Sequence, residues 1–232
     1  EANDITIDAT TGDILLGVVD AGTLLGDVFL NAADSILDNN GVAGNVTGDL
    51  VGLTAVDGIG TLLDAVETAA NSIDASVTGN GLVNIDEADD VALVDVDTAN
   101  GSIAVTAGGD LDAQDVQSLT DSDANDITLT STGGDLTAGL VNAGTNGDVT
   151  LNANGGAVLD DGTASVVTAD DLDINARDGI GAGDALETAA FDIWADSVNG
   201  DIDIENALGS AVVLHSLTTG TGNASFDQTG GG

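Results

Sequence analysis

Oxygen-bearing side chains that alternate along the chain are the first candidates for chemistry. Residues 121–126 supply such donors at nearly alternate positions, namely Asp121, Asp123, Asn125 and Asp126. This pattern is similar to the start of an EF-hand calcium loop. An EF-hand also needs glycine at its sixth position and glutamate at its twelfth, where this chain has Asp126 and Thr132. The segment therefore predicts a calcium site that lacks part of the EF-hand motif.

Three pairs of adjacent aspartates raise the question of acid–base catalysis: Asp89-Asp90, Asp160-Asp161 and Asp170-Asp171. Glycoside hydrolysis needs two carboxyl groups that face each other across the scissile bond. Neighbouring residues of a strand point to opposite faces, so these pairs need not converge. Enzymes that act on uronates also need basic residues, and this chain has only Arg177. We therefore interpret the pairs as solvated carboxylates and predict no enzyme.

The charge balance restricts the partners of the chain. It has 41 acidic residues against one basic residue, which gives a net charge of −40. Such a surface repels phosphate backbones and anionic headgroups, so we expect neither nucleic acid nor a membrane surface as a partner. No apolar run approaches the length of a membrane span, so we expect no direct membrane insertion. Hydrophobic residues nevertheless make up 42% of the chain, enough to build a core.

The chain consists of nearly two copies of one unit. At an offset of 121, residues 26–60 match residues 147–181 at 16 of 35 positions. The segment Ala2–Thr6 returns as Ala124–Thr128 at almost the same offset. We therefore expect two repeat units, residues 1–121 and 122–232, within one continuous fold.

A shorter period lies within each unit. Segments with apolar residues at alternate positions recur every 20–24 residues, between turns rich in Gly, Asn, Asp and Thr. Alternation over so few residues indicates strands with one buried face. The side chains expected to point inward and to stack in columns are Ile103, Val105, Ile127, Leu129, Val149, Leu151, Leu172 and Ile174.

This rhythm predicts an all-β fold, a right-handed parallel β-helix or β-solenoid with about 20–24 residues per coil. The alternative is a pair of tandem Ig-like sandwiches, because 120 residues is also a sandwich length; sandwiches usually carry more aromatic residues and longer strands. One stretch, Leu62 to Ala70, is also compatible with a short helical turn.

We expect Arg177 to pair with Asp178 or with a carboxylate on a neighbouring coil. His215 has no second His or Cys beside which to bind zinc, so we expect it at the surface or at a strand edge.

Several segments, taken together and in order, resemble the repeat region of giant filamentous-haemagglutinin-like bacterial adhesins: Gly147–Leu151, Thr168–Leu172, Asp178–Gly181, Leu186–Ala189 and Asn199–Ile204. The first copy has the same order of segments. The resemblance implies a right-handed β-helix shaft that is exported and displayed at the cell surface. It brings no catalytic residues with it.

The prediction for function is a structural shaft or filament segment of a large secreted bacterial surface adhesin or fibre, extracellular and without catalysis. The first alternative is a module that binds a glycan or a partner protein on a side face, with calcium sites. A polysaccharide-degrading β-helix enzyme is a weaker alternative.

Neither end of the sequence shows a cap, so further partners are a continuation of the same chain or end-to-end homo-oligomeric stacking into a filament. A host or cell-surface glycan or protein is a further partner, and calcium is the one cofactor considered.

Overall fold

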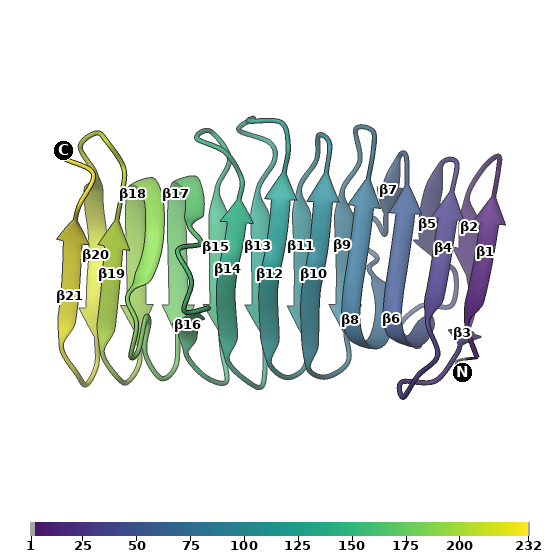
Figure 1. The fold of residues 1–232 in the computed structure, drawn as a ribbon, viewed down its shortest axis with the longest axis horizontal. Coiled ribbons are helices and arrows are strands. Elements are labelled where there is room, and N and C mark those ends of the chain that lie inside the picture. Colours follow the sequence, from purple (N-terminus) through teal and green to yellow (C-terminus); the bar gives the residue numbers. More distant parts are fainter. Residues whose placement is uncertain (1–2, 232) are drawn as a thin grey trace.

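A computed structural model describes residues 3–231 of the chain, so residues 1, 2 and 232 of the two predicted units lie outside it. The described residues form strands and turns without a helix, wound into a solenoid of about 10 turns with about 22 residues per turn. In Figure 1 the front strands run upward and the rear strands run downward while the chain advances from right to left. This winding is right-handed, so the predicted β-solenoid is confirmed.

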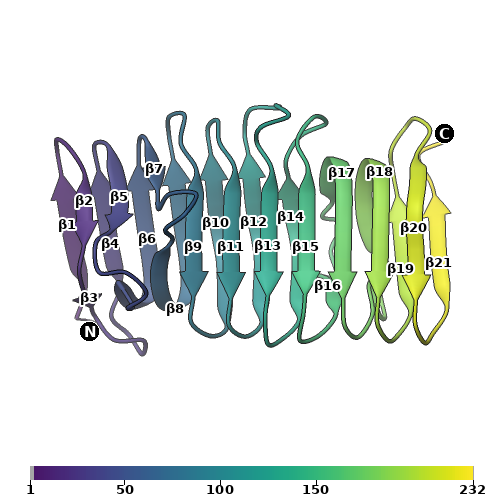
Figure 2. The same cartoon turned by 180° about the vertical axis from the view of Figure 1, so that it is seen from behind.

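Two parallel sheets make up most of the surface (Figures 1 and 2). The front sheet contains β1 (Ile5–Ala9), β4 (Val28–Ala32), β6 (Val46–Ala55), β8 (Val66–Val77), β10 (Val91–Thr98), β12 (Leu111–Ser118), β14 (Leu136–Asn142), β16 (Val158–Asp160), β19 (Ile202–Asn206) and β21 (Ala224–Gln228). The rear sheet contains β2 (Ile14–Leu16), β5 (Ser35–Asp38), β7 (Gly58–Ile59), β9 (Val83–Glu87), β11 (Ile103–Ala107), β13 (Ile127–Ser131), β15 (Val149–Ala153), β17 (Val167–Ala176), β18 (Leu186–Ser197) and β20 (Val213–Thr219). The short β3 (Val19–Asp20) pairs with the first residues of β6, at a third side of the coil.

The core is a set of apolar columns that run along the axis. Ile103 pairs with Ile127, Ile127 with Val149 and Val149 with Leu172, all in parallel register. The eight side chains predicted to point inward are all at most 1% exposed. Each is worth roughly 1.5–3 kcal/mol of hydrophobic stabilisation. These columns confirm the predicted core, and the parallel ladders show that the sandwich alternative is wrong.

The stretch from Leu62 to Ala70 is not helical. Leu62 and Leu63 lie in an exposed turn, 78% and 98% exposed, and the strand β8 begins at Val66. In this strand inward and outward residues alternate, so the apolar residues that suggested a helical turn belong to a strand with one buried face.

The repeat unit corresponds to a half-integral number of turns. Its offset of 121 residues, divided by about 22 residues per turn, gives about five and a half turns. In agreement, β4 lies in the front sheet, whereas β15, its counterpart 121 residues later, lies in the rear sheet. The second copy is therefore turned by half a revolution about the axis, and equivalent residues of the two copies face opposite sides.

Aspartate side chains connect the turns of the front sheet. The Oδ1 atom of Asp90 accepts the backbone amide of Asp110 at 2.8 Å, and Oδ1 of Asp110 accepts that of Asp135 at 2.8 Å. A Cβ atom at Gly134 would lie 2.0 Å from Oδ1 of Asp110, so only glycine leaves room for this carboxylate. Each Gly-Asp pair of this kind thus contacts both neighbouring turns. Its glycine makes room for the aspartate of the previous turn, and its own aspartate accepts a backbone amide of the next turn.

Candidate functional site

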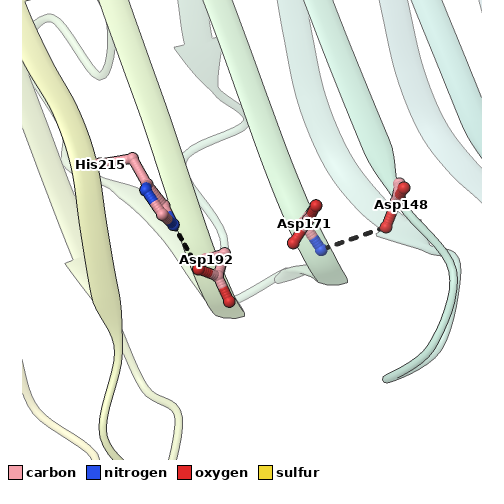
Figure 3. Close-up of polar contacts among 4 residues, drawn as sticks. All are labelled: Asp148, Asp171, Asp192 and His215. Carbon is pink, nitrogen blue, oxygen red and sulfur yellow. Dashed lines mark hydrogen bonds and ion pairs between the residues drawn. The ribbon is translucent and has the colours of Figure 1, made fainter.

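A row of aspartates crosses the rear sheet. Four of them immediately precede a buried residue on consecutive strands: Asp126, Asp148, Asp171 and Asp192. The backbone amide of Asp148 donates to Oδ1 of Asp126 at 3.2 Å, and that of Asp171 donates to Oδ1 of Asp148 at 3.3 Å (Figure 3). Because neighbouring strands lie about 4.8 Å apart, the ladder holds these carboxylates close to one another.

The environment of this row disfavours negative charge. Burial raises the pKa of Asp148, and the carboxylates of Asp126, Asp171 and Asp170 raise it further. Burial likewise raises the pKa of Asp171, with smaller contributions from Asp192 and Asp170, while His215 acts in the opposite direction. A proton or another cation in this row relieves the repulsion between the carboxylates.

Three carboxylates of this region come close enough to share an ion. Asp148, Asp170 and Asp171 each bring one oxygen within 4.8 Å of the others, the only such group within residues 3–231. Carboxylate oxygens suit hard cations, but Ca²⁺ takes six to eight oxygen ligands, so water or backbone oxygens would have to supply the rest. The sequence marked Asp170 and Asp171 as a solvated pair. It gave no signal for Asp148, which approaches them only through the stacking of turns.

The residues of the predicted calcium site serve other contacts. The carboxylate of Asp121 accepts the backbone amides of Thr145 and Asn146, both at 2.8 Å. Hydrogen bonds from the side chains of Asn146 and Thr145, with a smaller contribution from these backbone amides, lower the pKa of Asp121. Asn125 is buried, and its amide donates to the backbone oxygen of Thr120 at 2.8 Å. Asp123 is exposed.

Asp126 belongs to the aspartate row, where it accepts the amide of Asp148. Asp121, Asp123 and Asp126 thus do not bring their carboxylate oxygens within 4.8 Å of one another, as Asp148, Asp170 and Asp171 do. The calcium prediction at this motif remains a prediction.

His215 lies on the last rear strand, at the position where the β18–β20 ladder bulges. Ile193 pairs with Leu214 and Trp194 with Ser216, which leaves His215 as the extra residue. Its ring stacks on Trp194 with centroids 4.1 Å apart and planes 3° apart, and its Nε2 atom is hydrogen-bonded to Asp192 (Figure 3). This exposed position on a strand at the edge agrees with the sequence-based expectation.

Arg177 has a different partner from the one predicted. Its Nη1 atom donates to the backbone oxygen of Gly155 at 3.3 Å. Within the described part of the chain it forms no ion pair with Asp178 or with any other carboxylate. The prediction of an ion pair was wrong because Arg177 follows the end of β17, where its side chain reaches the turn of the previous coil.

Asp160 and Glu187 form a carboxyl pair between neighbouring coils. Burial, followed by the closeness of Asp160, raises the pKa of Glu187 to about 7. One oxygen of each group is buried without a hydrogen-bond partner among the described residues. These two oxygens are shielded from solvent, while the residues as a whole are half-buried.

In the first copy a buried amide occupies the space beside the corresponding carboxyl. Asn45 donates to Oδ1 of Asp38 at 2.7 Å and accepts the backbone amide of Glu67 at 2.9 Å. Val166 stands at the equivalent position in the second copy, so Asp160 and Glu187 lack this amide.

Comparisons of the chain with protein families, with characterised proteins and with solved structures find no match. Within residues 3–231 there is no helix long and apolar enough to cross a membrane.

Proposed function

We propose that this chain is a segment of a structural shaft, part of a large secreted bacterial surface adhesin or fibre. The observation that carries the proposal is the unbroken series of apolar columns and parallel ladders along the axis. Each turn contacts its neighbours alone, so such a rod can be lengthened by adding repeat units without a change in cross-section. About ten turns at about 4.8 Å give a rod of roughly 50 Å.

A non-catalytic role agrees with the chemistry of the carboxyl groups. Glu187, whose pKa is raised to about 7, and its neighbour Asp160 each have one carboxyl oxygen buried. The aspartate row lacks a basic residue to bind an anionic substrate, since Arg177 lies beyond the end of β17. The row supports a second role, the binding of a hard cation such as calcium by Asp148, Asp170 and Asp171.

The structure of the two ends supports further coils of the same solenoid as the partners of this chain. The strands β1 and β21 are the repeat counterparts of β13 and β11, which pair in register inside the chain. Apolar residues at the ends are open to solvent, with Ile7 36% and Leu214 39% exposed. Open ladders of this kind favour coverage by further coils, either of the same polypeptide or of a second copy.

Labelling of whole cells tests the proposed function. Antibodies raised against the purified chain, detected by immunogold electron microscopy, are expected to bind the outside of intact source cells. Mass spectrometry of the captured antigen is expected to yield a polypeptide much larger than 22.5 kDa or long fibres of a 22.5 kDa chain. Gold particles confined to the cell interior would contradict the proposal.

A further inference from the structure

Three residue types that occur once in the chain lie close together on one face. The only basic residue, Arg177, lies just after β17; the only tryptophan, Trp194, lies on β18; and the only histidine, His215, lies on β20. These three strands are neighbours in the rear sheet (Figure 2). The equivalent residues of the first copy are Val56, Asp74 and Val94, and they face the opposite side of the rod.

A groove with a mixed lining lies over these strands. It has a volume of about 530 Å³, and the apolar side chains Ala153, Ala176 and Val198 line it together with the polar side chains Asn154, Asn175, Arg177, Asp196, Ser197 and Thr218. Beside it, a smaller depression of about 310 Å³ is lined by Trp194 together with the aspartates Asp148, Asp171 and Asp173. Outward-facing residues two apart on a strand lie about 6.8 Å from each other, so Trp194 and Asp196 form one continuous surface.

The side chains around the groove are held in place and still have free hydrogen-bonding groups. The amide of Asn175 donates to Oδ1 of Asn152 at 3.2 Å and to Oδ1 of Asp173 at 3.1 Å, which leaves its own oxygen as an acceptor. Oδ1 of Asp196 accepts the hydroxyl of Ser216 at 2.6 Å, while Oδ2 makes no such bond. The guanidinium of Arg177 has five donors, of which one is engaged by Gly155.

The indole of Trp194 is fixed as well. His215 covers one face of its ring, and Asp192 holds His215 through a hydrogen bond. The other side of the indole borders the depression formed with Thr150 and Asp173. A rigid aromatic wall beside planar amide, carboxylate and guanidinium groups gives a site whose contact groups are already ordered.

We infer that this face binds a neutral oligosaccharide. The charge of −40 repels anionic ligands. The groove lined by Arg177 does not include Asp148, Asp170 or Asp171, the carboxylates proposed to bind a cation. Vicinal hydroxyl groups pair with planar side chains that offer both donors and acceptors, as Asn175, Asp196 and Arg177 do here. The apolar C–H face of a sugar ring packs against the indole of Trp194. This site is an addition to the proposed shaft, which does not depend on it.

Fluorescence of Trp194 tests the inference, because the chain has no second tryptophan. The intact chain would be titrated with cellotetraose, laminaritetraose, maltotetraose and mannotetraose. At least one is expected to give a saturable change in emission that persists at high NaCl concentration. Asn175→Ala and Arg177→Ala should each weaken that binding by about tenfold or more. Thr54→Ala, at the position of the first copy that corresponds to Asn175, should leave it unchanged.

Two results would overturn the inference. One is an unchanged emission with all four saccharides at millimolar concentration. The other is a response to spermidine alone that disappears in NaCl, which would assign the face to cations. Circular dichroism of each variant checks that it is folded, and either negative result leaves the shaft proposal standing.

Discussion

The pKa of a carboxyl group in this rod depends on which side chains of the neighbouring turn lie beside it. Glu67 and Glu187 occupy equivalent positions, and burial raises the pKa of both. Only Glu187 also faces a carboxyl group without an intervening amide, because Val166 replaces the equivalent of Asn45. Glu187 is the one whose pKa reaches about 7. Asp38 also raises the pKa of Glu67, but the amide of Asn45 donates to Asp38 there, and Val166 removes that hydrogen bond in the second copy.

This pair predicts a pH dependence of stability. The folded pKa of Glu187, about 7, lies above its ordinary value of 4.5, so the folded state binds the proton more tightly. Its contribution is full below about pH 4.5 and is lost as the pH rises through about 7. We expect the Tm to fall between pH 5 and pH 8, and to fall less in Glu187→Gln. Val166→Asn, which restores the amide of the first copy, should act in the same direction.

Thermal unfolding followed by circular dichroism at both pH values provides the measurement. Asp89→Asn removes one charge from an exposed position and serves as the control. An equal pH dependence in the wild-type chain, Glu187→Gln and the control would show that the pair does not bind the proton as described.

At the scale of single residues, the sequence could predict which side chains are inward but not which polar groups meet. Ile127 and Leu151 are identified by alternation along their own strand. The contact of Asp148 with Asp170 joins residues one turn apart, and their register depends on loop lengths that vary from coil to coil. The same reason explains why the motif at Asp121 indicated a calcium site, whereas the turn uses Asp121 to bind Thr145.

Strands in this fold are stabilised mainly by their neighbours in the stack, so a core change should affect more than one element. Leu151→Asp places a charge in a fully buried column between Leu129 and Ile174. The loss of burial and the unpaired charge together should lower the free energy of unfolding by about 4 kcal/mol or more. Asn152→Asp, on the outward side of the same strand, is the control. Chemical denaturation of both measures the difference, and a wild-type midpoint for Leu151→Asp would contradict the core assignment.

The contact between turns made by Gly-Asp pairs predicts a specific role for glycine. Gly134→Ala would force a Cβ to within 2.0 Å of Oδ1 and 2.8 Å of the backbone nitrogen of Asp110. We expect a loss of about 1–3 kcal/mol, because the backbone as well as the carboxylate must move. Gly17→Ala, with nothing within 4 Å of the added Cβ, should be neutral or slightly stabilising. Equal stabilities of the two variants, measured by urea unfolding, would refute this role.

Elements were well predicted where strands are regular and poorly predicted where the chain turns a corner. The spacing of 20–24 residues located β9, β11, β13 and β15. It did not reveal that β8 and β18 run for 12 residues around a corner. Glu87 at that corner is buried, with its carboxylate accepting the amide of Ala70 at 3.1 Å. A charged residue in an acidic sequence gives no local sign of such burial.

The whole molecule carries a charge that its fold must tolerate. At −40, added NaCl should raise the Tm by screening repulsion between turns. Calcium at matched ionic strength should raise it further, and Asp170→Asn should remove that extra rise more than Asp123→Asn, because three carboxylates meet at Asp170. Differential scanning calorimetry in chelator, NaCl and CaCl₂ gives the comparison. A Tm that is equal in all three solutions would contradict both the expected effect of salt and the expected additional effect of calcium.

The central claim is that the chain is an extendable rod, and duplication of one repeat unit tests it most directly. A second copy of residues 26–146 inserted after residue 146 adds 121 residues, or five and a half turns, and preserves the half-turn between units. Small-angle X-ray scattering should then show a maximum dimension longer by about 26 Å and an unchanged cross-section. A wider particle of unchanged length, or an unfolded insert, would contradict the account.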